Sequence, residues 1–192
     1  MLQMLRIAMA PIAFLLVLGI RVSMAAQAPV ESLAFKGDFP SPLLDPGALT
    51  KAGAAINVAL EITNTGNQKL RVSTYRSVLP ELVDGAGRRV PFDYGWNRSR
   101  PALPSDYPLL APGHSLVITV EATVAIKGGQ LDWKGSDGIL GFWIVAPAST
   151  SYRFRLKYNE RQATAGPFQA GSQLLSGIWT GEGVTDAVDL PL

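Results

Sequence analysis

A regular alternation of hydrophobic and polar residues is the strongest pattern in the chain, and it predicts β-strands. Over residues 55–63, 115–124 and 151–158 every second residue is hydrophobic. A period of two places one set of side chains on a buried face and the other set in solvent. The residues expected to face inward are Ile56, Val58, Leu60, Ile62, Leu116, Ile118, Val120, Ala122, Val124, Tyr152, Phe154, Leu156 and Tyr158.

Turn-forming residues separate these strands. Asn64–Asn67 follows the strand at 55–63, and the alternation resumes over Leu70–Thr74. Asparagine and glycine tolerate turn conformations, so the pattern predicts a β-hairpin between these two segments. Further hairpins are predicted at Asp84–Gly87, Gly128–Gly129 and Asp137–Gly138.

The fold class predicted is all-β, an immunoglobulin-like antiparallel β-sandwich of about seven to nine strands. Turn signals recur throughout and no helical period is evident. We expect one domain, residues 26–192, with long loops at 93–113 and 160–182, because a chain of this length builds a single core. Trp143 lies in an apolar run and is expected in that core. The last strand is expected at 184–190.

The first residues have the layout of a secretory signal peptide. A basic residue, Arg6, precedes the apolar run 7–20, and small residues follow around Ser23 and Ala25. The run is shorter than the roughly 20 residues that cross a bilayer. We therefore expect residues 1–25 to be cleaved, leaving a protein with no stable membrane anchor.

Charge and cysteine content refine the expected compartment. Residues 1–25 contain two of the 17 basic residues and no acid, so 15 basic and 15 acidic side chains remain after cleavage. A net charge near zero gives no field to attract nucleic acid, which disfavours a nucleic-acid partner. An exported chain without cysteine is typical of bacteria. The expected localisation is secreted or periplasmic.

The same composition disfavours an enzyme. Without cysteine there are no thiolate nucleophiles or thiolate metal sites, and His114 is the only histidine. His114 is interpreted as a turn residue, and the spacing of Asp132 and Asp137 fits a hairpin better than a calcium loop, because Lys134 occupies an expected ligand position. We expect no catalytic residues, no cofactor and no metal.

Parts of the chain resemble a known class of domains. Ile56–Val72, with its two strands around Asn64–Gly66, and the turn Pro112–Ser115 resemble bacterial exported immunoglobulin-like domains. These include the family named after an intracellular proteinase inhibitor of bacilli. Tyr152–Tyr158, Trp179–Gly181 and the last strand are similar to the closing strands of such domains. The resemblance implies a fold and, for the inhibitor family, an inhibitory role.

The predicted loop 93–113 holds the candidate binding residues. It combines aromatic rings with arginines: Tyr94, Trp96, Arg98, Arg100 and Tyr107. Such side chains stack on sugar rings or anchor protein partners. The alternative is that Tyr94 and Trp96 fold back and close one end of the sandwich.

A basic stripe follows one face of the strand at 151–158. Arg153, Arg155 and Lys157 would repel one another, so we expect acids on neighbouring strands to pair with them. Glu61 and Glu121 have the right facing. A solvated face with weak ion pairs is the simpler interpretation.

Three functions are compatible with this pattern. The first is a non-enzymatic interaction module for a protein partner at the cell envelope. The second is a polysaccharide-binding module in which Tyr94, Trp96 and Tyr107 stack on sugars. The third is a proteinase inhibitor with Arg98 or Arg100 as its inserted residue. A homodimer through an open sheet edge is also compatible with a sandwich.

Overall fold

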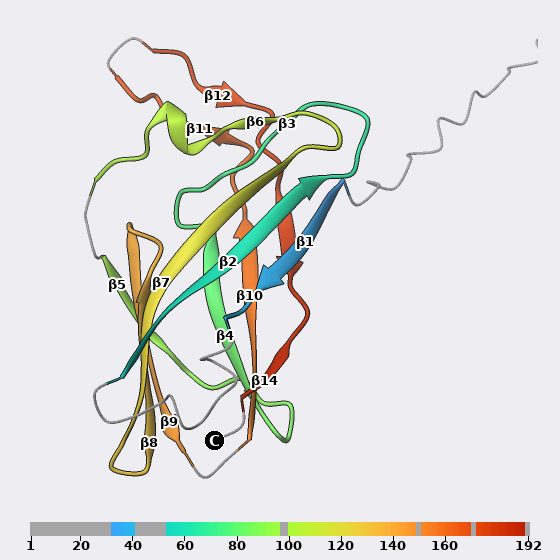
Figure 1. The fold of residues 1–192 in the computed structure, drawn as a ribbon. Helices are drawn as coiled ribbons and strands as arrows, with labels where there is room; N and C mark the ends of the chain where they lie inside the picture. Colours follow the sequence, from blue (N-terminus) through green and yellow to red (C-terminus); the bar gives the residue numbers. More distant parts are fainter. Residues whose placement is uncertain (1–31, 41–52, 97–99, 149–150, 170–171, 191–192) are drawn as a thin grey trace, which may run out of the picture.

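The computed structural model describes residues 32–40, 53–96, 100–148, 151–169 and 172–190. Figure 1 shows the strands in two layers, with β2 and β7 crossing in front of β10 and β4. The elements are β1 (Leu33–Asp38), β2 (Ala54–Asn64), β3 (Leu70–Arg71), β4 (Val78–Asp84), β5 (Asp93–Trp96), the 3₁₀ helix η3 (Pro104–Asp106), β6 (Leu109–Leu110), β7 (Ser115–Lys127), β8 (Gln130–Ser136), β9 (Leu140–Pro147), β10 (Tyr152–Glu160), β11 (Thr164–Ala165), β12 (Leu175–Ser176), β13 (Gly181–Val184) and β14 (Val188–Leu190). The prediction of an all-β chain with antiparallel sheets is confirmed.

The larger sheet has six strands in the order β1-β2-β7-β8-β9-β5. Its longest pairing runs from Ala54 opposite Val124 to Thr63 opposite Ser115. The hairpins at Gly128–Gly129 and Asp137–Gly138 are confirmed, since they join β7 to β8 and β8 to β9. Gly128 and Gly129 both have positive φ, which a glycine adopts without a steric penalty.

The smaller sheet is built on β10. Strand β4 pairs with one edge of β10, and β13 and β14 pair with the other edge. The turn after β4 is confirmed as a hairpin, because Val83 bridges Arg89 and the amide of Val90 donates to the carbonyl of Leu82. The strand expected at 184–190 is in fact two short strands, 181–184 and 188–190, interrupted around Thr185.

The core lies where the two sheets face each other. The residues predicted to face inward on β2 and β10 are all buried, and so are Ile118, Val120, Ala122 and Val124 on β7, whereas Leu116 is half-buried. Trp133 on β8 is fully buried and reaches Phe154 on β10. One contiguous cluster of buried hydrophobic side chains therefore joins both sheets.

The hairpin predicted around Asn64–Asn67 is wrong. Strand β2 pairs with β1 and β7, and β3 pairs with β6, which is distant in sequence. The Asn64 side chain explains the separation, because its amide donates to the carbonyls of Gln68 at 2.7 Å and Leu110 at 2.9 Å. It thereby ties the end of β2 both to the turn and to the segment before β7, and β3 pairs with β6 there.

The two predicted long loops contain regular structure. Residues 93–113 include β5, η3 and β6, and residues 160–182 include β11, β12 and the start of β13. These elements are two to four residues long. Strands this short are too brief to show an alternation in the sequence. Strand β1 was also not predicted, although it has six residues.

The partners predicted for the basic stripe are wrong. Arg155 pairs with Glu81 on β4, and the Lys157 Nζ lies 2.9 Å from Glu182 on β13. Glu61 and Glu121 belong to the other sheet, so they do not neighbour β10. The hydrogen bond from Lys157 lowers the pKa of the Glu182 carboxyl.

Candidate functional site

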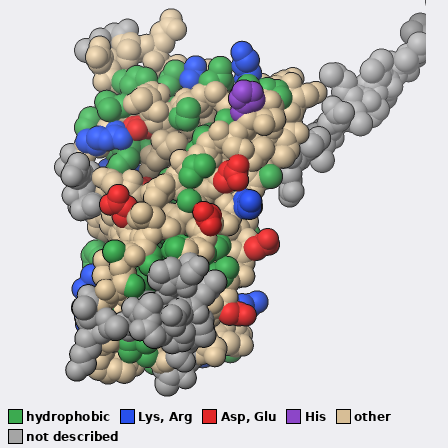
Figure 2. Space-filling view, viewed as in Figure 1, with side chains coloured by type: hydrophobic (Ala, Val, Ile, Leu, Met, Phe, Trp, Pro, Cys, Tyr) green, Lys and Arg blue, Asp and Glu red, His purple; other side chains and the backbone are tan. Residues whose placement is uncertain are grey.

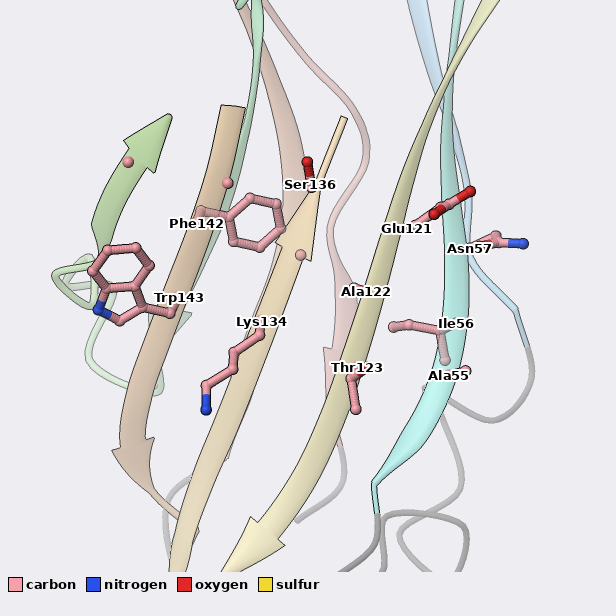
Figure 3. Close-up of a pocket in the computed structure, with 13 residues that line it drawn as sticks. Ala55, Ile56, Asn57, Glu121, Ala122, Thr123, Lys134, Ser136, Phe142 and Trp143 are labelled. Carbon is pink, nitrogen blue, oxygen red and sulfur yellow. The ribbon is translucent and has the colours of Figure 1, made fainter. Parts of the chain in front are cut away.

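A shallow depression of about 770 Å³ lies on the solvent-facing side of the six-stranded sheet (Figure 3). Residues from five elements line it: Ala55, Ile56, Asn57, Gly95, Glu121, Ala122, Thr123, Lys134, Gly135, Ser136, Gly141, Phe142 and Trp143. Most of the side chains on its solvent side are polar, and Trp143 is the large exposed aromatic among them.

Strand register brings these side chains together. Directly paired residues on adjacent strands point to the same face of a sheet. One row across the sheet is Ala55, Thr123, Lys134, Trp143 and Asp93. The next row is Asn57, Glu121, Ser136, Gly141 and Gly95. Four of these ten residues belong to β2 and β5, which precede β7–β9 along the chain, so only strand pairing brings them beside the other six.

The prediction that Trp143 belongs to the core is wrong, because its side chain is 41% exposed. Its neighbours Phe142 and Ile144 occupy the inward positions, and the period of two therefore turns Trp143 outward. In Figure 3 its ring leans toward β5, away from Lys134.

Two features hold the Trp143 ring against β5. Its Nε1 donates a hydrogen bond to Asp93 Oδ2 at 3.0 Å. Gly95 and Gly141 are paired beside it, and a Cβ on Gly95 would contact the far edge of the indole. Because these two residues are glycines, no side chain projects from the sheet at their positions beside the ring. One face of the indole is consequently open to a ligand.

A second depression of about 480 Å³ shares Lys134 and Trp143 with the first. Lys127, Gln130, Asp132 and Val145 complete its lining. The Asp132 carboxylate lies 3.2 Å from Lys134 Nζ and 3.6 Å from Lys127 Nζ. Together, the two depressions form a groove that crosses the sheet with Trp143 at its middle. We call this surface the Trp143 groove.

The charges around the groove are mixed. Lys127, Asp132, Lys134 and Glu121 contribute two positive and two negative side chains. The mixture extends beyond the groove, since Figure 2 shows acidic and basic side chains interspersed with hydrophobic ones over the upper part of the face in view. This arrangement offers hydrogen-bond donors and acceptors without a strong field of one sign.

The residues predicted as a binding cluster in 93–113 are dispersed. Tyr94 is 64% exposed on β5, but it alternates with Asp93 and so lies on the other face from Trp143. It packs beside Phe92, with 6.2 Å between ring centroids. Trp96 ends β5, and its side chain and Arg98 lie outside the described residues.

Arg100 is occupied by an internal ion pair. Its guanidinium donates two hydrogen bonds of 2.7 Å to Asp106, and its carbonyl accepts one from the Tyr75 hydroxyl. Burial tends to raise the pKa of Asp106, but the bonds from Arg100 and the Leu103 amide outweigh it and lower that pKa. Arg100 thus secures the turn before β6 and does not project as an inhibitor's inserted residue would.

Tyr107 cannot present its ring to a ligand in this structure. It is buried in a small second cluster with Ala165 and Ile178, and Phe168 covers it at 5.9 Å between ring centroids. Burial raises the pKa of the Tyr107 phenol. A buried ring cannot stack on a sugar, so the structure does not support the sugar-stacking role predicted for Tyr107.

Two other polar residues considered from the sequence, His114 and Asp137, lie in turns. His114 is exposed in a turn, where its amide donates to the Ala111 carbonyl. Asp137 caps the hairpin between β8 and β9, since its Oδ1 accepts from the amides of Ile139 and Leu140. Among the residues that the structure describes, no cluster of three acidic or histidine side chains is arranged to hold a metal ion.

Comparisons with protein-family models, with curated proteins and with solved structures found no match. Within the described part of the chain, no helix has the length and apolar character to span a membrane. The Trp143 groove is thus identified from its geometry alone. The sequence feature that could have indicated it is the alternation within Leu140–Pro147, because it places Trp143 and Val145 on the face opposite Phe142.

Proposed function

We propose that this protein is a non-enzymatic, exported binding module that holds a polysaccharide chain in the Trp143 groove. The observation that carries the proposal is the half-exposed indole of Trp143, which is hydrogen-bonded to Asp93 on β5 and lines both depressions of the groove together with polar side chains. Sugar rings bind through a flat apolar face and a rim of hydroxyl groups, so they need this combination of an aromatic surface and nearby hydrogen-bonding groups.

The lining of the groove supports an uncharged or weakly charged chain. Glu121 and Asn57 offer hydrogen-bonding groups in one depression, Gln130 and Asp132 offer them in the other, and Lys134 lines both. A ligand that extends past both sides of the indole would use both depressions. A chain of linked sugars has that shape, whereas a single small molecule would fill only one of them.

Export and fold class belong to the same proposal. The signal-peptide pattern of residues 1–25, which lie outside the described residues, supports release to the periplasm or medium. The face-to-face packing of two antiparallel sheets supports a distant relationship to bacterial exported immunoglobulin-like domains. A soluble module at the envelope would meet polysaccharide there.

The proposal is tested by following tryptophan fluorescence while the protein is titrated with soluble polysaccharides and bacterial wall fragments. We expect a saturable change for at least one polysaccharide and its loss in Trp143→Ala. Tyr94→Ala is the matched control, since it removes an exposed aromatic on the same strand pair but on the other face. A flat response to the whole panel, or binding that survives Trp143→Ala, contradicts the proposal.

A second candidate, binding of a protein partner, rests on Tyr94. This residue is the most exposed large hydrophobic residue described, and it lies on β5, an edge strand of the six-stranded sheet. An extended peptide could pair with the edge of β5 that faces no other described strand, and contact the Tyr94 ring. In that case Tyr94→Ala would abolish capture of the partner while Trp143→Ala would not.

A further inference from the structure

A cavity of about 180 Å³ lies on the outer side of the smaller sheet, away from the Trp143 groove. Three arginines line it, together with small or aliphatic residues: Arg89, Arg153, Arg155, Val83, Gly87 and Ala187. We call it the arginine cavity.

Strand pairing explains why the arginines converge. Val83 on β4 lies directly between Arg153 on β10 and Arg89, with which it forms an isolated bridge. These three residues form one row on the same face of the sheet, and Arg155 lies two positions along β10 from Arg153. Val83 is buried beneath them and forms an apolar floor.

Only part of the positive charge is neutralised. The buried carboxylate of Glu81 pairs with both Arg155 and Arg89, the latter at 2.7 Å. Arg153 makes no ion pair within 4.0 Å among the described residues, although Asp189 is its paired residue on β14. Three guanidinium groups therefore share one ion-paired carboxylate. With the charge of Asp189 also counted, an excess of about one positive charge remains around the cavity.

We propose that the arginine cavity binds a phosphate group. A phosphate monoester carries about −1.5 to −2 charges at neutral pH, so the excess positive charge of the cavity would attract it. Guanidinium groups donate paired hydrogen bonds to phosphate oxygens in a fixed geometry. Glu81 already orients two of the three guanidiniums, so little side-chain freedom remains to be lost on binding.

This site is independent of the proposed polysaccharide groove, because the two surfaces belong to different sheets. The chemistry would recognise either free phosphate or a phosphate ester on a larger molecule at the envelope. The shared feature is a terminal phosphate with three accessible oxygens. A phosphodiester carries one charge and fewer free oxygens, and should bind more weakly.

Calorimetric titration of the full chain with inorganic phosphate, in chloride at constant ionic strength, tests the proposal. We expect saturable binding and a loss of at least tenfold in affinity in Arg153→Gln. This substitution leaves both ion pairs of Glu81 intact, so it should not unfold the protein. Arg88→Gln is the control, because Arg88 is a nearby exposed arginine that pairs with Asp84 and does not line the cavity.

Glycerol phosphate, titrated in parallel, distinguishes the two sources. Tighter binding than inorganic phosphate indicates an ester on a larger molecule, and weaker binding indicates the free ion. The absence of saturable binding by either probe overturns the proposal, as does an equal loss of affinity in Arg153→Gln and Arg88→Gln. Fluorescence titration with polysaccharide should be unchanged in Arg153→Gln, so failure of one site does not imply failure of the other.

Discussion

The indole of Trp133 on β8 stacks on the ring of Phe154 on β10, with 4.1 Å between centroids and 29° between planes. Both side chains are fully buried. This contact joins the centres of the two sheets, because β8 lies inside the larger sheet and β10 is the strand on which the smaller sheet is built. An aromatic pair of this kind adds stability beyond the area that it buries.

We therefore expect Trp133→Ala to reduce the free energy of unfolding by about 3 to 5 kcal/mol, through loss of buried surface and formation of a cavity. Urea unfolding monitored by circular dichroism measures the change. Trp133→Phe keeps an aromatic ring against Phe154 and should cost clearly less. Equal losses in the two variants would show that the stacked ring is not what stabilises the interface.

Tyr158→Phe, which removes only the hydroxyl oxygen, should also lower the free energy of unfolding. Its hydroxyl donates to the Ser73 carbonyl at 3.0 Å and accepts from the Ser73 amide at 3.1 Å, and burial raises the pKa of the phenol. Tyr158→Phe leaves two buried backbone groups without this partner, and should cost about 1 to 3 kcal/mol. Tyr152→Phe, which removes one hydrogen bond to Pro147, should cost less in the same unfolding experiment.

Asp106 should make the stability depend on pH in the acid range. Its pKa in the folded protein lies below the ordinary value of 3.8, so folding favours the ionised form. The stabilisation is complete above the pKa of the unfolded chain and is lost as the pH falls through the folded pKa. Asp106→Asn should therefore destabilise the protein at neutral pH by about 1 to 2 kcal/mol, a modest value because the Arg100 side chain is 36% exposed.

The measurement is a series of urea unfolding curves for wild type and Asp106→Asn between neutral pH and the acid limit of the folded state. The difference between the two proteins should shrink as the pH falls. A difference that stays constant with pH would show that Asp106 acts through its shape and not through its charge.

Asp93 should position Trp143 without contributing to folding stability. It is exposed, and its hydrogen bond to the indole crosses from β5 to β9. In Asp93→Ala the indole is free to leave the sheet surface, so we expect a three- to tenfold weaker affinity for the polysaccharide identified by titration. The unfolding free energy should change by less than about 0.5 kcal/mol. Asp93→Asn keeps an acceptor for Nε1 and should retain most of the affinity.

Local patterns in the sequence were sufficient to predict the longest strands and three of the four predicted hairpins, whereas the hairpin at Asn64–Asn67 and strand β1 were not predicted correctly. In β2, β7 and β10 the alternation marked the buried face, because in each of these strands one face packs against a core and the other meets solvent. The turns at Gly128–Gly129 and Asp137–Gly138 were also predictable, since they depend on residues that adopt turn conformations. These features need only information from neighbouring residues.

Only the tertiary structure decided which strands pair, and with them the candidate sites. The pairing of β3 with β6 depends on hydrogen bonds from Asn64 to groups on both sides of a long sequence interval. The Trp143 groove combines residues from β2, β5 and β7–β9, and the arginine cavity combines residues 83–89 with residues of β10 and Ala187. The alternation predicts which residues of one strand share a face. It does not predict which other strand pairs with that strand. That choice follows from packing between residues far apart in the chain, which no local pattern records.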